Sequence, residues 1–156
     1  NVKQELTLSK EISEESGWSS FLVNSTRAWI KFCMGKNITE FHINRSWVVR
    51  QFSNEYNPVH WHSGHISGAG FLKLPSTFGE TFQKDKKNLN GKLVLIHGSK
   101  SFLCNSKYEI IPEVGDFYIF PHYLMHTVYP FKDTNDERRS ISFNAKVDDK
   151  IFYEIF

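Results

Sequence analysis

Apolar residues recur at helical spacing in one stretch of the chain, residues 17–34. The apolar positions there are three, four or seven residues apart, which places them on one face of a helix: Trp18, Phe21, Leu22, Trp29, Phe32 and Cys33. Gly35 follows, and a glycine at this position is typical of a helix end. We therefore expect a helical N-terminal part over about residues 5–36, with its apolar face packed on the rest of the fold.

From residue 46 onward the pattern changes to short β-prone runs that alternate with turn residues. Eight strands are predicted, at residues 46–52, 67–74, 92–98, 107–112, 117–121, 126–131, 140–147 and 150–156. This pattern favours a mostly-β fold, a double-stranded β-helix (jelly roll), in a single domain over residues 1–156 with its β core at about 46–156. Residues 75–90 fit neither pattern, and we expect an exposed loop there.

Composition excludes some classes of function. The net charge is only +2 and the basic residues are scattered, which gives no support for nucleic-acid binding. No apolar run approaches the roughly 20 residues that a helix needs to span a bilayer. Cys33 and Cys104 are far apart in the sequence, and we expect both to be reduced in a cytoplasmic protein.

Three histidines fall within six positions of the segment NPVHWHSGHISG, residues 57–68: His60, His62 and His65. Pro58 disfavours a helix, and in an extended segment His60 and His62 point to the same face. Two imidazoles on one face can share a metal ion at about 2.0–2.2 Å from each nitrogen. An isolated pair of this kind is weak evidence, so a metal site, a pH-sensitive surface and chance all stay open at this point.

Two later segments add candidate groups. In VGDFYIFPHYLMHTVYPF, residues 114–131, His126 opens a predicted strand and is either a ligand or a hydrogen-bonded core histidine. In DERRSISFNAKV, residues 136–147, Arg138 and Ser140 face the same way if the chain is extended, and Arg139 faces the opposite way. A guanidinium beside a hydroxyl suits a small carboxylate, because guanidinium binds carboxylates bidentately. An ordinary charged turn is the alternative.

Together the segments HWHSGHISGAGFLKLP, GDFYIFPHYLMHTVYPF and ERRSISFN resemble the 2-oxoglutarate- and Fe(II)-dependent oxygenases. The resemblance covers about residues 46–147 and is greatest to a prolyl-hydroxylase-like group of marine bacteria and T4-like phages. It implies a jelly roll that holds iron at its open end, with His60 and His126 as ligands. It also implies that Arg138 and Ser140 bind the far carboxylate of 2-oxoglutarate.

The chain departs from the family pattern at the second ligand. The family has a carboxylate two positions after the first histidine, whereas this chain has His62. His62 itself, Glu55, His65 or a non-protein ligand could complete the site, and we favour His62 because of its spacing. The predicted metal-binding and catalytic residues are therefore His60, His62 and His126. Without the carboxylate, binding of Fe(II) should be weaker.

The resemblance implies that Fe(II), 2-oxoglutarate and O2 together hydroxylate a C–H bond of a small-molecule or peptidyl substrate, with a prolyl residue as the first expectation. Five apolar residues are expected to shield the reaction: Phe71, Phe117, Ile119, Val128 and Phe143. Tyr56, Trp61 and Tyr123 are expected at the entrance. A three-histidine zinc hydrolase or lyase and a non-catalytic jelly-roll binding or structural module are the alternatives. The sequence predicts no oligomeric state.

Overall fold

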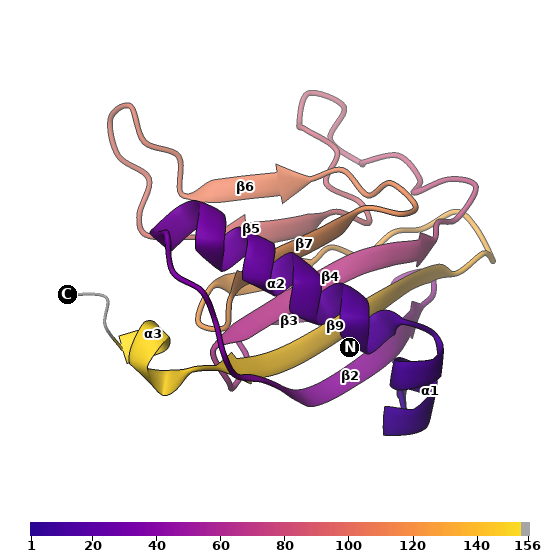
Figure 1. Ribbon diagram of the computed structural model, residues 1–156. Coiled ribbons are helices and arrows are strands. Elements are labelled where there is room, and N and C mark those ends of the chain that lie inside the picture. Colours follow the sequence, from indigo (N-terminus) through magenta and orange to yellow (C-terminus); the bar gives the residue numbers. More distant parts are fainter. Residues whose placement is uncertain (154–156) are drawn as a thin grey trace.

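The computed structural model describes residues 1–153, which form nine strands and three helices (Figure 1). In chain order these are β1 (Gln4–Thr7), α1 (Lys10–Glu15), α2 (Trp18–Met34), β2 (Phe41–Gln51), β3 (Asn57–His60), β4 (Ile66–Lys73), β5 (Leu93–Ile96), β6 (Lys107–Ile110), β7 (Phe117–Pro121), β8 (Met125–Val128), β9 (Arg138–Val147) and α3 (Asp149–Tyr153). The prediction of a mostly-β fold is confirmed. All paired strands are antiparallel.

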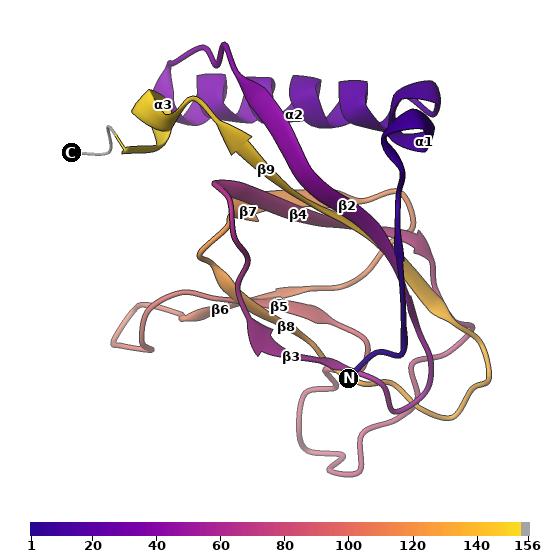
Figure 2. The same cartoon turned by 90° about the horizontal axis from the view of Figure 1, so that it is seen from below.

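The strands form two sheets, and α2 covers one of them. The larger sheet has the order β1-β2-β9-β4-β7 and the smaller one the order β3-β8-β5-β6. Figure 2 shows α2 along the outer side of the larger sheet and the smaller sheet on its other side. One core cluster joins Leu22 and Ile30 of α2 to the larger sheet, and a second cluster lies between the sheets around Phe71, Leu93 and Val128. The space between the two sheets is where a site can form.

Strand β9 divides its side chains between these two layers. Successive residues of a strand point to opposite faces. Phe143, Ala145 and Val147 belong to the core cluster under α2. The alternate residues Arg138, Ser140 and Ser142 line a cavity between the sheets. One strand thus supplies both apolar packing for the helix and polar groups for a site.

The predicted helix over residues 17–34 is confirmed by α2. Its last turn is closed by the Gly35 N–H, which donates to the Lys31 carbonyl at 2.9 Å. Gly35 has φ of 68°, a left-handed conformation that glycine adopts without steric cost.

The predicted strand over residues 150–156 is wrong, because residues 149–153 form α3 and residues 154–156 lie outside the described part of the chain. The Asp148 carboxylate accepts the N–H groups of Thr39 and Glu40 at 2.9 and 3.1 Å, and the Asp148 carbonyl accepts the Phe152 N–H. The chain therefore turns at Asp148. The Phe152 ring then stacks on His65, with ring centroids 4.0 Å apart.

Strands β1 and β3 were not predicted as strands, because β1 is exposed and polar and β3 contains a proline. The strand predicted at residues 117–121 agrees with β7, whereas β8 ends at Val128, two residues before Pro130. Residues 75–90 contain no helix or strand.

Cys33 and Cys104 are exposed and are not joined by a disulfide. Within residues 1–153, no helix has both the length and the apolar character needed to cross a membrane.

Candidate active site

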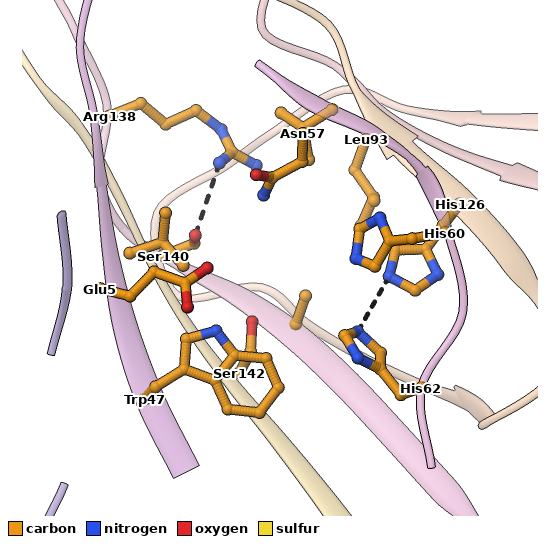
Figure 3. A pocket seen from close by; sticks show the side chains of 13 residues that line it. Glu5, Trp47, Asn57, His60, His62, Leu93, His126, Arg138, Ser140 and Ser142 are labelled. Carbon is orange, nitrogen blue, oxygen red and sulfur yellow. Dashed lines mark hydrogen bonds between the residues drawn. The ribbon is translucent and has the colours of Figure 1, made fainter. Parts of the chain in front are cut away.

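Three histidine side chains converge where β3 meets β8. His60 and His126 are direct partners in the antiparallel pair of these strands, and His62 follows two residues after His60. The ring centroids are 4.2 Å apart for His60–His126, 4.9 Å for His60–His62 and 5.0 Å for His62–His126. One nitrogen from each ring lies within 4.8 Å of the other two. Figure 3 shows the three rings facing one another.

Backbone carbonyls orient two of these rings. The Nδ1 atoms of His60 and His126 lie 2.7 Å from the Pro58 carbonyl and 2.9 Å from the Leu124 carbonyl. An Nδ1–H that donates to a carbonyl leaves Nε2 with a free lone pair, which is the usual arrangement of metal-binding histidines. The Nε2 atoms of His126 and His62 are 3.2 Å apart. Two nitrogens bound at right angles to one metal ion would be about 3 Å apart.

His122 fixes the position of His62, although it does not belong to the three-histidine cluster. The His62 N–H donates to the His122 carbonyl at 3.0 Å. The His122 ring returns a contact from Nδ1 to the His62 carbonyl at 2.8 Å. These two bonds join the H-x-H segment to the segment that carries His126, which explains how histidines some 60 positions apart in the sequence come together.

The environment of the cluster keeps two imidazoles neutral. Burial lowers the pKa of His62 to about 4, with smaller contributions from His126, His60 and Arg45. Burial also lowers the pKa of His126 to about 4, and His60 adds to this effect. A neutral imidazole is the form that binds metal, so protons do not compete for these two nitrogens near neutral pH.

These pKa values predict loss of stability in mild acid for the metal-free protein. The unfolded chain takes up protons on His62 and His126 near pH 6.5, whereas the folded chain does so only near pH 4. Stability is therefore complete above about pH 6.5 and falls toward pH 4, by at most about 1.4 kcal/mol per pH unit for each histidine and by less for the partly exposed His62. Urea unfolding at about pH 7.5 and about pH 5 measures this loss. His126→Gln should reduce the dependence of stability on pH. An unchanged dependence would contradict the lowered pKa assigned to His126.

Arg138 is a buried cation with no anionic partner among residues 1–153. Its side chain is only 2% exposed, and burial lowers its pKa to about 10, so it stays charged at neutral pH. Its Nη1 donates to Gln51 Oε1 at 3.3 Å and to Ser140 Oγ at 3.4 Å, and within the described chain its Nε has no hydrogen-bond partner. A buried charge of this kind is costly unless an anion compensates it. The donor set of Arg138 therefore fits a bound carboxylate.

Gln51 positions Arg138 and was not identified from the sequence. Gln51 is fully buried and lies opposite Arg138 in the β2–β9 register. Its side-chain amide donates to the Glu55 carbonyl at 2.7 Å and to the Tyr129 carbonyl at 3.3 Å, which leaves Oε1 to accept from Arg138. Strand β2 mixes apolar and polar residues, so nothing in the sequence sets Gln51 apart from its neighbours.

The histidines and Arg138 line the same cavity, which we call the inner cavity. Figure 3 shows Arg138 and Ser140 on one side of it and His60, His62 and His126 on the other. Further lining residues that the sequence did not indicate are Glu5, Trp47, Asn57, Leu93 and Ser142. The cavity therefore has three imidazoles at one end and a buried guanidinium at the other.

Other candidates from the sequence lie elsewhere. The buried His65 is tied to Val147 by contacts of Nδ1 with its carbonyl and N–H at 3.1 and 3.2 Å, so it is no spare ligand. Glu55 uses its carboxylate to accept the Phe52 N–H at 3.1 Å. Arg139 pairs with Glu137, away from the inner cavity, as expected from alternation along β9.

The predicted apolar shell is only partly correct. Phe71 and Val128 lie between the sheets, in the cluster next to the inner cavity. Phe117, Ile119 and Phe143 belong to the cluster under α2 and cannot shield the site, because their strand positions point to the other face of the larger sheet. Neither Tyr56, Trp61 nor Tyr123 lines the inner cavity, where Trp47 is the aromatic residue instead.

Comparison with known proteins gives one family match. Residues 45–144 match the family described as "Putative 2OG-Fe(II) oxygenase". No curated protein shows significant sequence similarity to the chain.

Several solved structures share the fold. A Burkholderia pseudomallei oxidoreductase of the 2OG-Fe(II) oxygenase family has a TM-score of 0.58 at 15% identity over 84% of this chain. A Pseudomonas putida prolyl-4-hydroxylase has a TM-score of 0.58 at 14% identity, with 90% of this chain and 67% of that one covered. The viral collagen prolyl hydroxylase of Paramecium bursaria Chlorella virus 1, in its 2OG complex, has a TM-score of 0.55 at 15% identity, with 91% and 77% covered. The present chain spans 56% of the Burkholderia protein.

Proposed function

Because the chain belongs to the 2OG-Fe(II) oxygenase family, whose members use iron and 2-oxoglutarate, we propose that His60, His62 and His126 hold the iron and that Arg138 with Ser140 binds 2-oxoglutarate. The substrate is then hydroxylated at a C–H bond. The observation that carries this proposal is the buried Arg138, which has no anionic partner in the described chain and lines the same cavity as the three histidines. The water activation of a zinc hydrolase and the packing of a structural jelly roll do not by themselves require such a cation.

The reaction divides between the bound groups and the chain. Bound iron and 2-oxoglutarate supply the oxidising chemistry, in which O2 converts 2-oxoglutarate to succinate and CO2 and adds one oxygen atom to the substrate. The chain supplies position. The three imidazoles would hold the metal, and Arg138 and Ser140 would hold the far carboxylate. Leu93 and Val128 contribute apolar walls that limit access of water.

Prolyl hydroxylation is the first substrate that we propose, on similarity of fold. Two of the proteins that share the fold are named as prolyl hydroxylases. Their identity to this chain is low. A free amino acid and a residue within a peptide are therefore two separate candidate substrates.

The proposed function is tested by mixing the protein with Fe(II) and 2-oxoglutarate under argon. We expect a visible charge-transfer band, because iron that chelates the keto acid absorbs there. Admission of O2 should then release succinate. Absence of the band and of succinate, in protein that retains its fold, would reject the oxygenase. A zinc enzyme would give neither signal.

The proposed ligand His62 is neutral where the family has a carboxylate. Replacing it with an acidic residue should therefore raise the affinity for iron. A carboxylate in place of His62 places a negative charge beside the dication, so His62→Asp or the longer His62→Glu should bind Fe(II) at least about 10-fold more tightly, roughly 1.4 kcal/mol. Competition with a chromogenic chelator measures the affinity. His62→Gln is the neutral control and should bind more weakly than the wild type. If both acidic variants bind iron no better than His62→Gln, residue 62 is not a ligand.

A further inference from the structure

A second hollow, which we call the outer chamber, opens beside the inner cavity. It has a volume of about 310 Å³ and shares Glu5, Trp47, Asn57, His60 and His62 with the inner cavity. Arg45 lines the outer chamber and does not line the inner cavity. This volume is at the lower end of the range for small-molecule sites. The outer chamber therefore gives a small substrate access to the histidine cluster.

Two opposite charges stand next to each other in this chamber. Arg45 Nη2 lies 3.5 Å from Glu5 Oε2, and the two side chains are 47% and 40% exposed. Glu5 comes from β1, opposite Val49 of β2, and Figure 3 shows its carboxylate directed into the cavity beside Ser140 and Trp47. The pair is thus open to a ligand and has a long, partly solvated contact.

Packing connects this pair to the histidine cluster. The Arg45 guanidinium lies over the Trp47 ring, 4.9 Å from its centroid. The Trp47 ring in turn meets His62 edge-on, with centroids 5.5 Å apart. The charged pair is therefore one aromatic side chain away from a proposed iron ligand, close enough for a small molecule to contact both.

The pair contributes little to the fold itself. A half-exposed ion pair with a single contact adds little to the stability of a protein. Strand β1 is held to β2 by four backbone register pairs, and Arg50 binds Gln4 on the opposite face. Holding β1 in place therefore does not require Glu5 and Arg45 to meet, so both charges are available to a ligand in the chamber.

We propose that the outer chamber binds a free amino acid, with its ammonium group on Glu5 and its carboxylate on Arg45. A carboxylate accepts the N–H groups of an ammonium, and a guanidinium binds a carboxylate bidentately, so two charge-assisted contacts replace one weak pair. The amino-acid side chain then extends past Trp47 toward the histidines. An internal residue of a peptide lacks both charges. The assignment of this ligand as a substrate rests on the proposed function.

The test is calorimetric titration of the metal-free full chain with L-proline and the other standard amino acids, followed by the N-acetyl and amide forms of the best ligand. We expect at least one free amino acid to bind and each blocked form to bind at least about 10-fold more weakly, because each loses one charge-assisted contact. Glu5→Gln and Arg45→Gln should weaken binding of the free amino acid to a similar extent. Glu14→Gln, which removes one charge of the remote exposed Lys10–Glu14 pair, is the matched control and should bind like the wild type.

Three results would overturn the inference: no binding of any free amino acid, equal binding of blocked forms, or unchanged binding in both Glu5→Gln and Arg45→Gln. Binding is measured without iron or 2-oxoglutarate, so these results are independent of the charge-transfer band. A band without amino-acid binding rejects only the outer chamber as an amino-acid site. Amino-acid binding without a band supports the chamber and rejects the oxygenase.

Discussion

Arg138→Met is expected to abolish binding of 2-oxoglutarate while leaving the fold intact. Loss of a buried, charge-assisted partner weakens binding by about 2–5 kcal/mol, or roughly 30- to 4,000-fold. The effect on stability is small, because two terms oppose each other. Removal of an uncompensated buried cation is stabilising, because its desolvation penalty is lost. Loss of the donor to Gln51 and Ser140 costs about 1–3 kcal/mol.

Thermal unfolding with and without 2-oxoglutarate measures both effects of Arg138→Met. A ligand at about 100 times its Kd stabilises the wild type by about 2.7 kcal/mol, and the variant should show no such shift. Arg139→Met is the matched control, because Arg139 is the next residue of β9 and pairs with Glu137 away from the inner cavity. If Arg138→Met keeps the shift, Arg138 does not bind the cosubstrate. A loss of about 3–5 kcal/mol in the ligand-free variant would instead indicate a structural ion pair.

His126→Ala is expected to lose the metal ion. Loss of a group that only orients a ligand typically costs 10–100-fold in metal affinity, so loss of the ligand itself should cost at least about 100-fold. His126 is 5% exposed and its Nε2 lies 3.2 Å from that of His62, so no solvent-exposed alternative replaces it easily.

Metal content after dialysis against a defined Fe(II) or Zn(II) concentration measures this loss, with circular dichroism as the check on the fold. His42→Ala is the control, because His42 is exposed on β2 and stands outside the cluster. Full metal occupancy in His126→Ala would remove His126 from the site. Equal loss of metal in His42→Ala would show that the assay does not report on this cluster.

The sequence predicted those parts of the site that depend on strand alternation. Arg138 and Ser140 are two residues apart on one strand, so their common face follows from local geometry, and the structure places both in the inner cavity. The approach of His60 to His126 depends on the pairing of β3 with β8, which no local pattern specifies. The resemblance to a family supplied that link. The roles of these residues as ligands stay predictions.

Two residues that reach the site only through the register between paired strands were not predicted from the sequence. Glu5 belongs to an exposed four-residue strand with no alternating pattern, and it enters the cavity only because β1 pairs with β2 opposite Val49. Gln51 resembles any polar strand end until Arg138 is placed opposite it. The error at residues 150–156 has a similar origin, because a run of aromatic and aliphatic residues suits a strand or a short helix. The Asp148 carboxylate accepts the N–H groups of residues 39 and 40, and this contact favours a turn at Asp148 over a continued strand.

The two-sided character of β9 limits how this protein can diverge. Insertion or deletion of a single residue between Arg138 and Phe143 would exchange the two faces, so that Phe143 would enter the cavity and a charged or hydroxyl group would be pressed against α2. Insertions and deletions should therefore be tolerated in connections such as residues 75–90 and selected against in β9, where the spacing between residues must stay the same.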